Sequence, residues 1–338
     1  MERIRFGRTE LKVSRVALGG IPLMRVSLDN AVTIVREAID CGINFIDTAN
    51  AYADSEIKIG AAIRGLPREE LVIASKSQAS DKLSLSRHLE QSLAQLGVDY
   101  IDIYQLHNIS SQSRNEVFAP GGAFEGLLEA VQAGKVRFPA FSCHRVPLAL
   151  EIMREGLFDV VQLPFNYIDT EAAAEAIPLA KELDMGFIAM KPMGGGLLYD
   201  AGLSFRYLLQ FDSIIPDPGV EKLEELREIV DIVTSAQQLT EEDKATIEQL
   251  RRELSESWCH RCGYCQPCPQ GIPINNVLTT RSFLKRFTLE GAQRMASSGI
   301  ERARSCTGCR ECVSRCPYDL EIPEMLKENI AYWDSHTI

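Results

Sequence analysis

Eight of the ten cysteines in this 338-residue chain fall in its last quarter, in two runs of four. The first run is Cys259, Cys262, Cys265 and Cys268, and the second is Cys306, Cys309, Cys312 and Cys316. The first three cysteines of each run stand three positions apart, and a proline follows the last one. A loop with this spacing wraps one face of a cubane iron–sulfur cluster, and the cysteine before the proline ligates the other cluster.

The spacing therefore predicts two [4Fe–4S] clusters that exchange one ligand each. The first cluster is expected on Cys259, Cys262, Cys265 and Cys316, and the second on Cys306, Cys309, Cys312 and Cys268. The second run matches the bacterial ferredoxin pattern in full. The first run has one residue fewer between its last two cysteines, so the exchange of Cys268 follows less directly than the clusters themselves.

Two other interpretations compete with iron and sulfur. Structural zinc favours paired C-x-x-C knuckles, and a disulfide framework belongs to secreted chains. Neither explains two dense runs that both end in Cys-Pro. Cys41 and Cys143 lie outside the pattern, and we expect both to be small buried hydrophobic residues.

The composition is that of an ordinary globular protein, with 45% hydrophobic residues and a net charge of 36 minus 47, or −11. No stripe of lysine and arginine is present to bind a phosphate backbone, so we expect no nucleic-acid partner. No apolar run approaches a signal peptide or a membrane span, so we expect no membrane association and a cytoplasmic protein with reduced thiolates. The acidic surface serves solubility or orients an electron-transfer partner.

Short β-branched runs alternate with amphipathic helical stretches from Val13 to about Val233, which is typical of a parallel sheet built from βα units. Eight such units favour an α/β fold, a closed (β/α)8 TIM barrel, over an open doubly wound sheet. The eight predicted strands are Ser14 to Leu18, Asn44 to Asp47, Leu71 to Ser75, Tyr100 to Leu106, Ala140 to Ser142, Val160 to Leu163, Gly186 to Met190 and Ser213 to Ile215. The fifth begins after Pro139, because proline cannot donate to a central ladder.

Helices are predicted between the strands, and glycines follow four of the helical stretches where a left-handed residue is wanted. The ranges are Asp29 to Cys41, Ser84 to Leu96, Gly122 to Ala133, Ala172 to Leu183 and Lys222 to Ser235, and the glycines are Gly42, Gly97, Gly134 and Gly156. Residues 2 to 12 are expected to form a hairpin below the barrel. A further helix, Thr240 to Leu254, opens with Thr240 and Asp243 at capping-box spacing. We therefore expect a barrel at 1–238, a linker helix at 239–257 and a mainly helical, ferredoxin-like cluster domain at 258–338.

Polar residues end three of the predicted strands, and in a TIM barrel the carboxyl ends of the strands form the active face. Asp47 ends the second strand, Lys76 the third and His107 the fourth. Tyr52 follows Asp47 by five residues on the adjoining loop. The pattern predicts an acid, a cation, its counter-ion and an imidazole at one mouth.

The contexts FIDTANAY, IASK and YQLH resemble the aldo-keto reductases, and the similarity extends from LGG at 18 to 20 through the eighth strand. With its cysteine-rich tail, the chain resembles the ferredoxin-fused branch of that family. The resemblance implies reduction of an aldehyde or ketone to an alcohol. Tyr52 would give the proton, Lys76 would lower the pKa of that phenol, Asp47 would hold Lys76, and His107 would orient the substrate oxygen.

The resemblance also implies a nicotinamide dinucleotide, NADP or NAD, across the barrel mouth. Ser142 and Gln162 match positions that hold its carboxamide, and Met190 stands where many members stack a tyrosine on the ring. Lys191 to Gly196, which ends in a glycine triplet, lies where the family cradles the pyrophosphate. The full set of expected contacts is Gly20, Ser142, Gln162, Met190, Lys191, Pro192, Met193, Gly194, Asp217 and Gly219. Asp217 replaces the glycine expected after Ile-Pro, and Lys222 is the nearest cation for a 2′-phosphate. His144 also points toward the active face, and we expect it to pack under the cofactor.

Three functions are consistent with these features. The first, which we favour, is a carbonyl reductase with a cluster domain that relays electrons, with a ferredoxin-like protein as its partner. The second is an electron-transfer protein whose barrel is a docking scaffold. The third is an ordinary carbonyl reductase whose clusters are structural. No G-x-G-x-x-G motif follows a strand, so nothing indicates a flavin, although a barrel can hold one without that motif.

Overall fold

The structure is a computed structural model that describes the chain except residues 110–113, 255–256, 262, 264, 317 and 338. Its chain divides into two compact units. The first comprises Met1–Gly194 and Leu198–Leu239, and the second comprises Gly195–Leu197 and Thr240–Ile338. Within the described ranges, no helix has the length and apolar character needed to cross a membrane.

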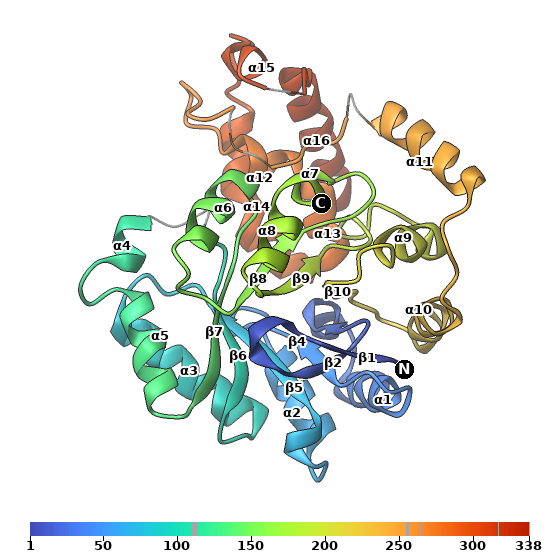
Figure 1. Cartoon of the computed structure of the whole chain (residues 1–338). Coiled ribbons are helices and arrows are strands. Elements are labelled where there is room, and N and C mark those ends of the chain that lie inside the picture. The colour runs from blue at the N-terminus through green and yellow to red at the C-terminus, as the bar shows by residue number, and fades with distance from the viewer. Residues whose placement is uncertain (110–113, 255–256, 262, 264, 317, 338) are drawn as a thin grey trace. The chain divides into compact units, whose positions relative to one another are not determined.

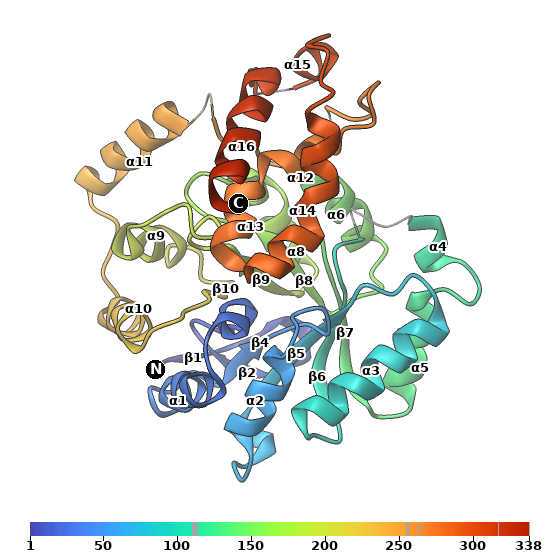
Figure 2. The ribbon, with the colours of Figure 1, turned by 180° about the vertical axis from the view of Figure 1, so that it is seen from behind.

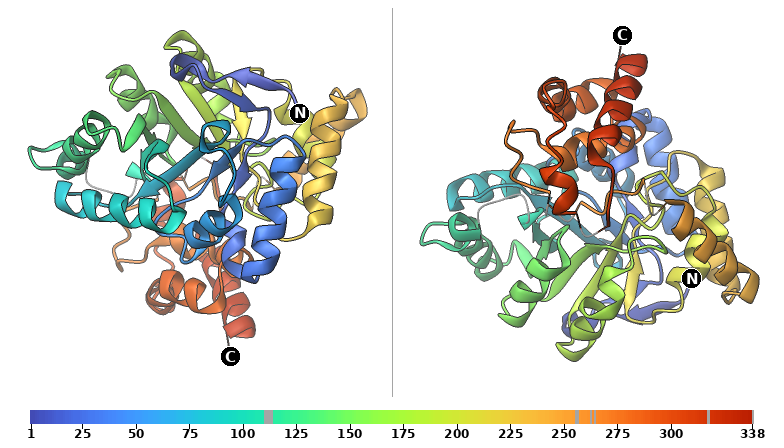
Figure 3. Two further views of the ribbon diagram at one scale, coloured as in Figure 1. Left: turned by 90° about the horizontal axis from the view of Figure 1, so that it is seen from below. Right: turned by 90° about the horizontal axis from the view of Figure 1, so that it is seen from above.

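Eight parallel strands form the sheet of the first unit, in the part of the chain that the structure describes. They pair in strict chain order, from β3 to β10. Ala17 N–H donates to the Pro216 carbonyl at 2.9 Å, and Gly19 N–H donates to the Pro218 carbonyl at 2.8 Å, which joins the first strand to the last. The predicted (β/α)8 barrel is therefore confirmed (Figure 3). The strands are β3 (Leu18–Gly19), β4 (Phe45–Asp47), β5 (Val72–Ser77), β6 (Ile101–Leu106), β7 (Val136–Ser142), β8 (Val160–Pro164), β9 (Gly186–Met190) and β10 (Ile214–Pro216).

Helices cover the outside of these strands (Figures 1 and 2). They are α1 (Leu28–Asp40), α2 (Ser55–Ile63), α3 (Lys82–Leu96), α4 (Arg114–Phe118), α5 (Ala123–Gln132), α6 (Val146–Arg154), α7 (Glu171–Ala174), α8 (Ala176–Glu182), α9 (Ala201–Leu208) and α10 (Leu223–Ser235). Short 3-10 helices lie at η1 (Gly7–Thr9), η2 (Ile21–Arg25) and η3 (Arg68–Glu70). Gly42, Gly97, Gly134 and Gly156 all adopt a positive φ, as predicted, because each follows a helix that ends in a left-handed turn.

The predicted N-terminal hairpin is present as β1 (Arg3–Arg5) and β2 (Lys12–Ser14), which pair antiparallel. Its Phe6 ring packs edge-on against Phe45, with centroids 5.6 Å apart. Phe6 shares a core cluster with Phe45, Val72 and Val160, which are the first residues of their strands. The hairpin therefore closes the amino-terminal end of the barrel.

Three predicted boundaries are wrong. Residues 14–18 are not one strand, because Ser14 belongs to the hairpin and only Leu18–Gly19 pairs with β4. Pro139 lies inside β7, not before it. Its carbonyl accepts from Asp159 N–H, so it faces β8, where pairing begins only at Ala140 and Val160. No ladder bond is lost at that proline.

The third wrong boundary concerns the helix predicted from Ala172 to Leu183. It is broken into α7 and α8 at Glu175, whose φ of −132° is not helical. Pro178 lies near the start of α8, where its missing N–H costs no helical hydrogen bond. The break follows because a continuous helix would have placed that proline in its interior.

The second unit is helical in its described residues. Its helices are α11 (Glu241–Leu254), α12 (Ile274–Leu278), α13 (Thr280–Arg286), α14 (Leu289–Ala303), α15 (Glu311–Ser314) and α16 (Ile322–Thr337). Thr240 N–H donates to Asp243 Oδ2 at 2.9 Å, and Asp243 N–H donates to Thr240 Oγ1 at 3.1 Å, which is the predicted capping box of α11. The core of this unit joins Trp333 and aliphatic residues to Cys265 and Cys312.

Candidate active site and candidate cluster site

The centre of the barrel mouth is an ion pair between Lys76, on β5, and Asp47, at the end of β4. Lys76 Nζ lies 2.5 Å from Asp47 Oδ2 and donates to the Thr48 carbonyl at 2.7 Å. Both charged side chains are buried, Asp47 at 3% and Lys76 at 2% exposure. A buried pair of this kind fixes both groups in place, since either charge alone would be costly.

The phenol of Tyr52 lies close to this ion pair. Lys76 Nζ is 5.3 Å from the centroid of the half-buried Tyr52 ring. Burial alone would lower the pKa of Lys76, but the charges of Asp47 and then Tyr52 outweigh it and raise the pKa above its ordinary value. The interaction is reciprocal, so the ammonium of Lys76 favours the phenolate form of Tyr52.

His107 completes this group from the loop after β6. Its ring packs edge-on against Tyr52, with centroids 5.7 Å apart and an interplanar angle of 83°. Desolvation and then the charge of Lys76 lower the pKa of His107 to about 3. The imidazole is therefore neutral at pH 7. The structure thus brings together all four residues for which the sequence predicted a catalytic role.

Gln105 is a member of this group that the sequence analysis missed. Its Nε2 donates to Asp47 Oδ1 at 3.1 Å, and the side chain is fully buried. Alternate residues of a strand face the same side, so Gln105 lies two positions before His107 on the inward face. Its position two residues before His107 was the sequence signal that could have identified Gln105 as a member of the site.

Gln162, expected to hold a nicotinamide carboxamide, reaches the same network from β8. Its Nε2 donates to Asp217 Oδ2 at 2.8 Å and lies 3.2 Å from Asp47 Oδ2. Its Oε1 is buried and has no hydrogen-bond partner among the described atoms. That free acceptor oxygen could accept from the N–H of a nicotinamide carboxamide. The Nε2 atom of Gln162 already donates to Asp217.

Other expected cofactor contacts lie at the ends of β7 and β9. Ser142 Oγ accepts from Asn108 N–H at 2.8 Å. Lys191 has a φ of +60°, and its carbonyl accepts from the buried Asn166 side chain at 3.1 Å. Lys191 Nζ lies 3.3 Å from His144 Nδ1, so these two side chains meet beyond the strand ends.

The remaining expected contacts are placed as follows. Met190 is the last residue of β9, and Pro192, Met193 and Gly194 follow it on the loop, with Met193 against the barrel core. Gly20 and Gly219 are explained by the protein's own packing. A Cβ at Gly20 would lie 2.7 Å from Ser55 Oγ, and one at Gly219 would lie 2.5 Å from the Pro22 ring.

A buried polar cluster outside the sheet was also not predicted. Glu56 on α2 is 1% exposed, and its Oε1 accepts from Ser75 Oγ at 2.5 Å. Burial raises the pKa of Glu56. Ser75 precedes Lys76 and so faces the opposite side of β5, away from the mouth. No sequence pattern marked this carboxyl group.

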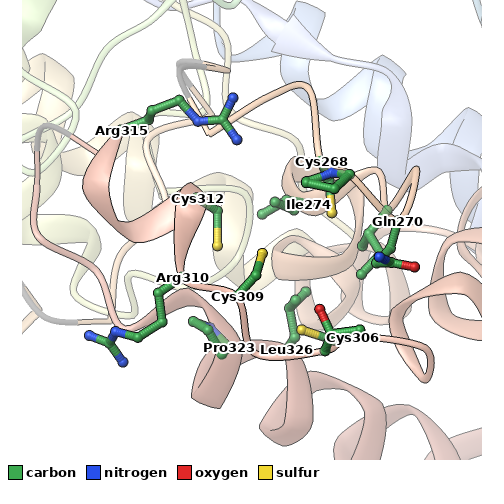
Figure 4. A pocket seen from close by; sticks show the side chains of 13 residues that line it. Cys268, Gln270, Ile274, Cys306, Cys309, Arg310, Cys312, Arg315, Pro323 and Leu326 are labelled. Atoms are coloured by element: carbon green, nitrogen blue, oxygen red, sulfur yellow. The ribbon is translucent and has the colours of Figure 1, made fainter.

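In the second unit, four cysteines line one pocket, and Figure 4 shows their sulfurs directed into the same space. They are Cys268, Cys306, Cys309 and Cys312. This is the quartet expected to hold the second cluster, including the cysteine from the other run. The rest of the lining is mainly apolar, with Ile274, Pro323 and Leu326 among its residues.

The two cysteine loops share a backbone pattern. Arg261 and Gly263 have positive φ values of 61° and 85°, and Gly308 and Arg310 have values of 68° and 61°. Each pair stands two and four residues after the first cysteine of its run. Left-handed residues alternating with others turn successive N–H groups toward an anion, as in many Fe–S sites. The loops therefore fit a thiolate-bound cluster.

The other expected quartet is described in part. Cys259 and Cys316 are half-buried and Cys265 is buried, all against the core of the second unit, while Cys262 lies outside the described residues. Across the described residues, no three His, Cys, Asp or Glu side chains converge on a single-ion site. An ion such as zinc needs sulfurs about 2.3 Å from one centre, whereas a cubane cluster spreads its four thiolates over four irons.

Of the two remaining cysteines, Cys143 is buried as predicted, while Cys41 is only half-buried. Cys143 Sγ lies 3.3 Å from the Arg145 carbonyl, inside the core of the barrel. Cys41 packs at the edge of that core.

The chain combines the barrel of an oxidoreductase with an iron–sulfur module. Residues 15–204 match the profile of the aldo/keto reductase family, and residues 258–321 match that of the 4Fe-4S dicluster domain. The first match covers more than half of the chain. The protein therefore belongs to the aldo/keto reductase family and is an oxidoreductase of that type, as the sequence motifs predicted.

Curated relatives include the NADH-specific methylglyoxal reductase of Escherichia coli, 29% identical over 228 residues that cover 59% of this chain and 69% of the relative. An uncharacterized oxidoreductase of Bacillus subtilis is 33% identical over 231 residues, covering 59% and 68%. L-galactose dehydrogenase of Arabidopsis thaliana is 31% identical over 216 residues, covering 58% and 66%.

Solved structures show the same fold. An aldo-keto reductase from Bacillus halodurans in its holo form has a TM-score of 0.64 at 22% identity, covering 74% of this chain and 96% of that one. An aldo-keto reductase from Klebsiella pneumoniae in complex with NADPH has a TM-score of 0.61 at 21% identity, covering 74% and 95%. At these identities the likeness supports the barrel architecture.

Proposed function

We propose that this protein is an NAD(P)H-dependent reductase that converts the carbonyl group of an aldehyde or ketone into an alcohol. The observation that carries the proposal is the Lys76–Asp47 ion pair at the barrel mouth, with Tyr52 and His107 beside it. Carbonyl reduction needs a proton on the oxygen as a hydride arrives at the carbon. A phenol beside a buried ammonium is suited to give that proton.

Each residue has a separate part in this reaction. Tyr52 donates its O–H proton to the carbonyl oxygen, and the resulting phenolate is stabilised by Lys76 until solvent returns the proton. Asp47 keeps Lys76 charged and in place. His107, neutral at pH 7, hydrogen-bonds the substrate oxygen and orients it toward Tyr52. A nicotinamide dinucleotide, NADH or NADPH, supplies the hydride when bound, and Gln162 Oε1 would accept from its carboxamide.

The names of two similar proteins support a nicotinamide coenzyme. The methylglyoxal reductase is named as NADH-specific, and the Klebsiella neighbour is a complex with NADPH. Both coenzymes therefore occur among proteins similar to this one. We propose a small carbonyl compound as the substrate class, with NADH or NADPH as the coenzyme.

We also propose that the second unit holds two [4Fe–4S] clusters on the quartets predicted from the sequence. The cluster of Cys268, Cys306, Cys309 and Cys312 would lie near the surface, because residues 307–311, which include Cys309, are exposed. An exposed cluster edge suits exchange of single electrons with a ferredoxin-like partner. The clusters would relay such electrons, two for each hydride equivalent.

A structural role for the clusters is the second candidate. Cys265 and Cys312 belong to the buried core of the second unit, and four other described cysteines, Cys259, Cys268, Cys306 and Cys316, pack against it. A core of this kind needs its metal for folding. Reduction of a one-electron dye separates the two roles: the relay predicts that the wild-type protein reduces the dye and that Cys309→Ser, at an exposed cysteine, lowers this rate, whereas a purely structural role predicts no dye reduction by the wild-type protein.

The test of the reductase assignment is the Tyr52→Phe variant, assayed with NADH and NADPH against a panel of small aldehydes and ketones. We expect carbonyl reduction to fall by about 10²- to 10⁴-fold, because the general acid is lost. Tyr100→Phe is the matched control, since Tyr100 precedes β6 at the opposite end of the barrel, where Arg68 packs on its ring. Equal turnover in wild type and Tyr52→Phe would reject the assignment.

A further inference from the structure

The loop that carries Tyr52 joins β4 to α2, and two contacts on either side of the tyrosine reach the same part of β5. Asn50 N–H donates to the Lys76 carbonyl at 3.0 Å. Glu56, the second residue of α2, accepts from Ser75 Oγ at 2.5 Å through its Oε1. Residues 50 and 56 therefore bind consecutive residues of β5, and one of these is the lysine beside the Tyr52 ring.

A further contact closes the base of this loop. Thr48 Oγ1 and Ser55 Oγ lie 2.9 Å apart, and both side chains are fully buried. Ser55 Oγ also donates to the Gly20 carbonyl at 2.9 Å. Thr48 and Ser55 thus fix the two ends of the loop to each other, whereas Asn50 and Glu56 fix it to β5.

The carboxyl group of Glu56 is costly in the place that it occupies. The side chain is 1% exposed, and its Oε2 has no hydrogen-bond partner among the described atoms. Burial raises the pKa of Glu56, and the Ser75 hydroxyl and the charge of Lys76 oppose the rise. An apolar side chain would fill the same space without this cost. The carboxyl group therefore indicates that its contact with Ser75 has a role beyond packing.

We propose that Glu56 is a positioning residue for the proton donor. By holding Ser75, it fixes the Tyr52 loop against the strand that carries Lys76, and so sets the 5.3 Å separation between Lys76 Nζ and the centroid of the Tyr52 ring. The interaction that favours the phenolate weakens as this separation grows. Glu56 itself takes part in no proton transfer, because Ser75 faces away from the mouth. The inference rests on the proposed function, since it takes Tyr52 as the acid.

Three variants separate position from charge and from packing. Glu56→Ala removes the acceptor of the Ser75 hydroxyl, and Ser75→Ala removes the hydroxyl and leaves the carboxyl group. Glu56→Gln keeps an acceptor oxygen on a side chain of the same length and removes any charge. Asp102→Asn is the matched control, because Asp102 is also a fully buried carboxylate and lies near the start of β6, at the amino-terminal end of the barrel.

The experiment combines two measurements on the anaerobically purified full chain. The first is an ultraviolet titration of Tyr52, taken as the difference between each variant and the same variant with Tyr52→Phe, and the second is turnover of the best small aldehyde or ketone. For Glu56→Ala, we expect the pKa of Tyr52 to move toward its ordinary value of about 10 and kcat to fall by about 10- to 100-fold, with the Kd of the nucleotide unchanged. Ser75→Ala should change both in the same direction. Glu56→Gln should retain most of both wild-type values, and Asp102→Asn should leave both unchanged.

The outcomes separate this inference from the proposed function. If the wild-type protein reduces no carbonyl compound, the proposed function fails, and the Tyr52 titration of Glu56→Ala still decides the inference. If it does reduce them and Glu56→Ala leaves the Tyr52 pKa and kcat unchanged, the inference is overturned while the reductase assignment stands.

Two further results would also overturn the inference. A Glu56→Gln variant that changes as much as Glu56→Ala would show an effect of charge, and an equal shift in Asp102→Asn would show a general loosening of the barrel. If circular dichroism shows that Glu56→Ala does not fold, Ser75→Ala decides, and an unchanged Tyr52 pKa in that variant would reject the positioning role.

Discussion

The two units of this protein stabilise their buried polar groups in different ways. In the barrel, two buried carboxylates have charged protein partners: Asp47 pairs with Lys76, and Asp102 accepts from Arg68 and Arg137. In the second unit, the cysteines face a shared pocket, and we propose that iron binds them. The barrel sequence therefore carries its own counter-charges, whereas on our proposal the second unit would depend on a group that the chain does not encode.

The largest expected effect is the loss of iron. Because the thiols of the second unit line its core, removing iron anaerobically with a chelator should abolish the folded helices of that unit and leave the barrel intact. Circular dichroism with limited proteolysis measures this, and a stable barrel fragment is expected. Cys312→Ser should act similarly, whereas Cys143→Ser, in the barrel core, should keep the iron. If the second unit stayed folded without iron, the proposed difference between the two units in how they stabilise buried polar groups would be contradicted.

The next effect tests the barrel's own counter-charges. Lys76→Met leaves Asp47 buried without its cation, so we expect the barrel to lose about 3–5 kcal/mol of unfolding free energy. Lys82→Met is the control, because Lys82 is exposed and its ion pairs with Glu125 and Glu129 are at the surface. That variant should lose at most about 1 kcal/mol in denaturant titration. Equal losses in the two variants would contradict the assigned importance of the buried pair.

A smaller effect is expected at the opposite end of the barrel. Asp102 is fully buried near the start of β6, and its oxygens also accept from Ile73 N–H at 2.9 Å. Asp102→Asn should cost about 1–3 kcal/mol, since Arg68 and Arg137 both lose their charged partner. Carbonyl reduction by the folded variant should be unchanged, because the site lies at the carboxyl ends of the strands. Loss of turnover at full stability would show that the two ends are coupled.

The last prediction is a pH dependence, whose effect is small near neutral pH and grows as the pH falls. The folded-state pKa of His107 is about 3, below the value of about 6.5 in an unfolded chain. As the pH falls from about 6.5 toward 3, the unfolded chain binds the proton first, so the barrel loses stability, by up to about 1.4 kcal/mol for each pH unit. His107→Gln should reduce this slope, and the exposed His336→Gln should not. A slope that is the same in all three proteins would reject the neutral imidazole.

The regular parts of the fold were predictable from local chemistry. Glycines after helices, the reciprocal contacts of Thr240 and Asp243, and the strand end at Asp47 follow from rules that act over a few residues. The helix break at Glu175 and the position of Pro139 inside β7 could not be predicted from such local rules. Each depends on where a neighbouring strand or helix begins, which the local sequence does not record.

The same division applies to the site. Tyr52, Lys76 and His107 could be predicted because motifs place Lys76 and His107 near strand ends and Tyr52 on the loop after one, and the structure brings them together. The bridge from Gln162 to Asp47 and Asp217 joins β8 to the last residue of β4 and the first residue after β10, a contact that only barrel closure creates. Side-chain contacts between strands that are far apart in the sequence cannot be predicted from local patterns.

The central claim is that Lys76 makes Tyr52 a stronger acid than an ordinary tyrosine. An ultraviolet difference titration of wild type against Tyr52→Phe isolates the tyrosinate absorbance of that one residue. The account predicts a phenol that ionises well below the ordinary pKa of about 10 and that returns toward this value in Lys76→Met. A Tyr52 that ionises at or above about 10 in the wild-type protein would contradict it.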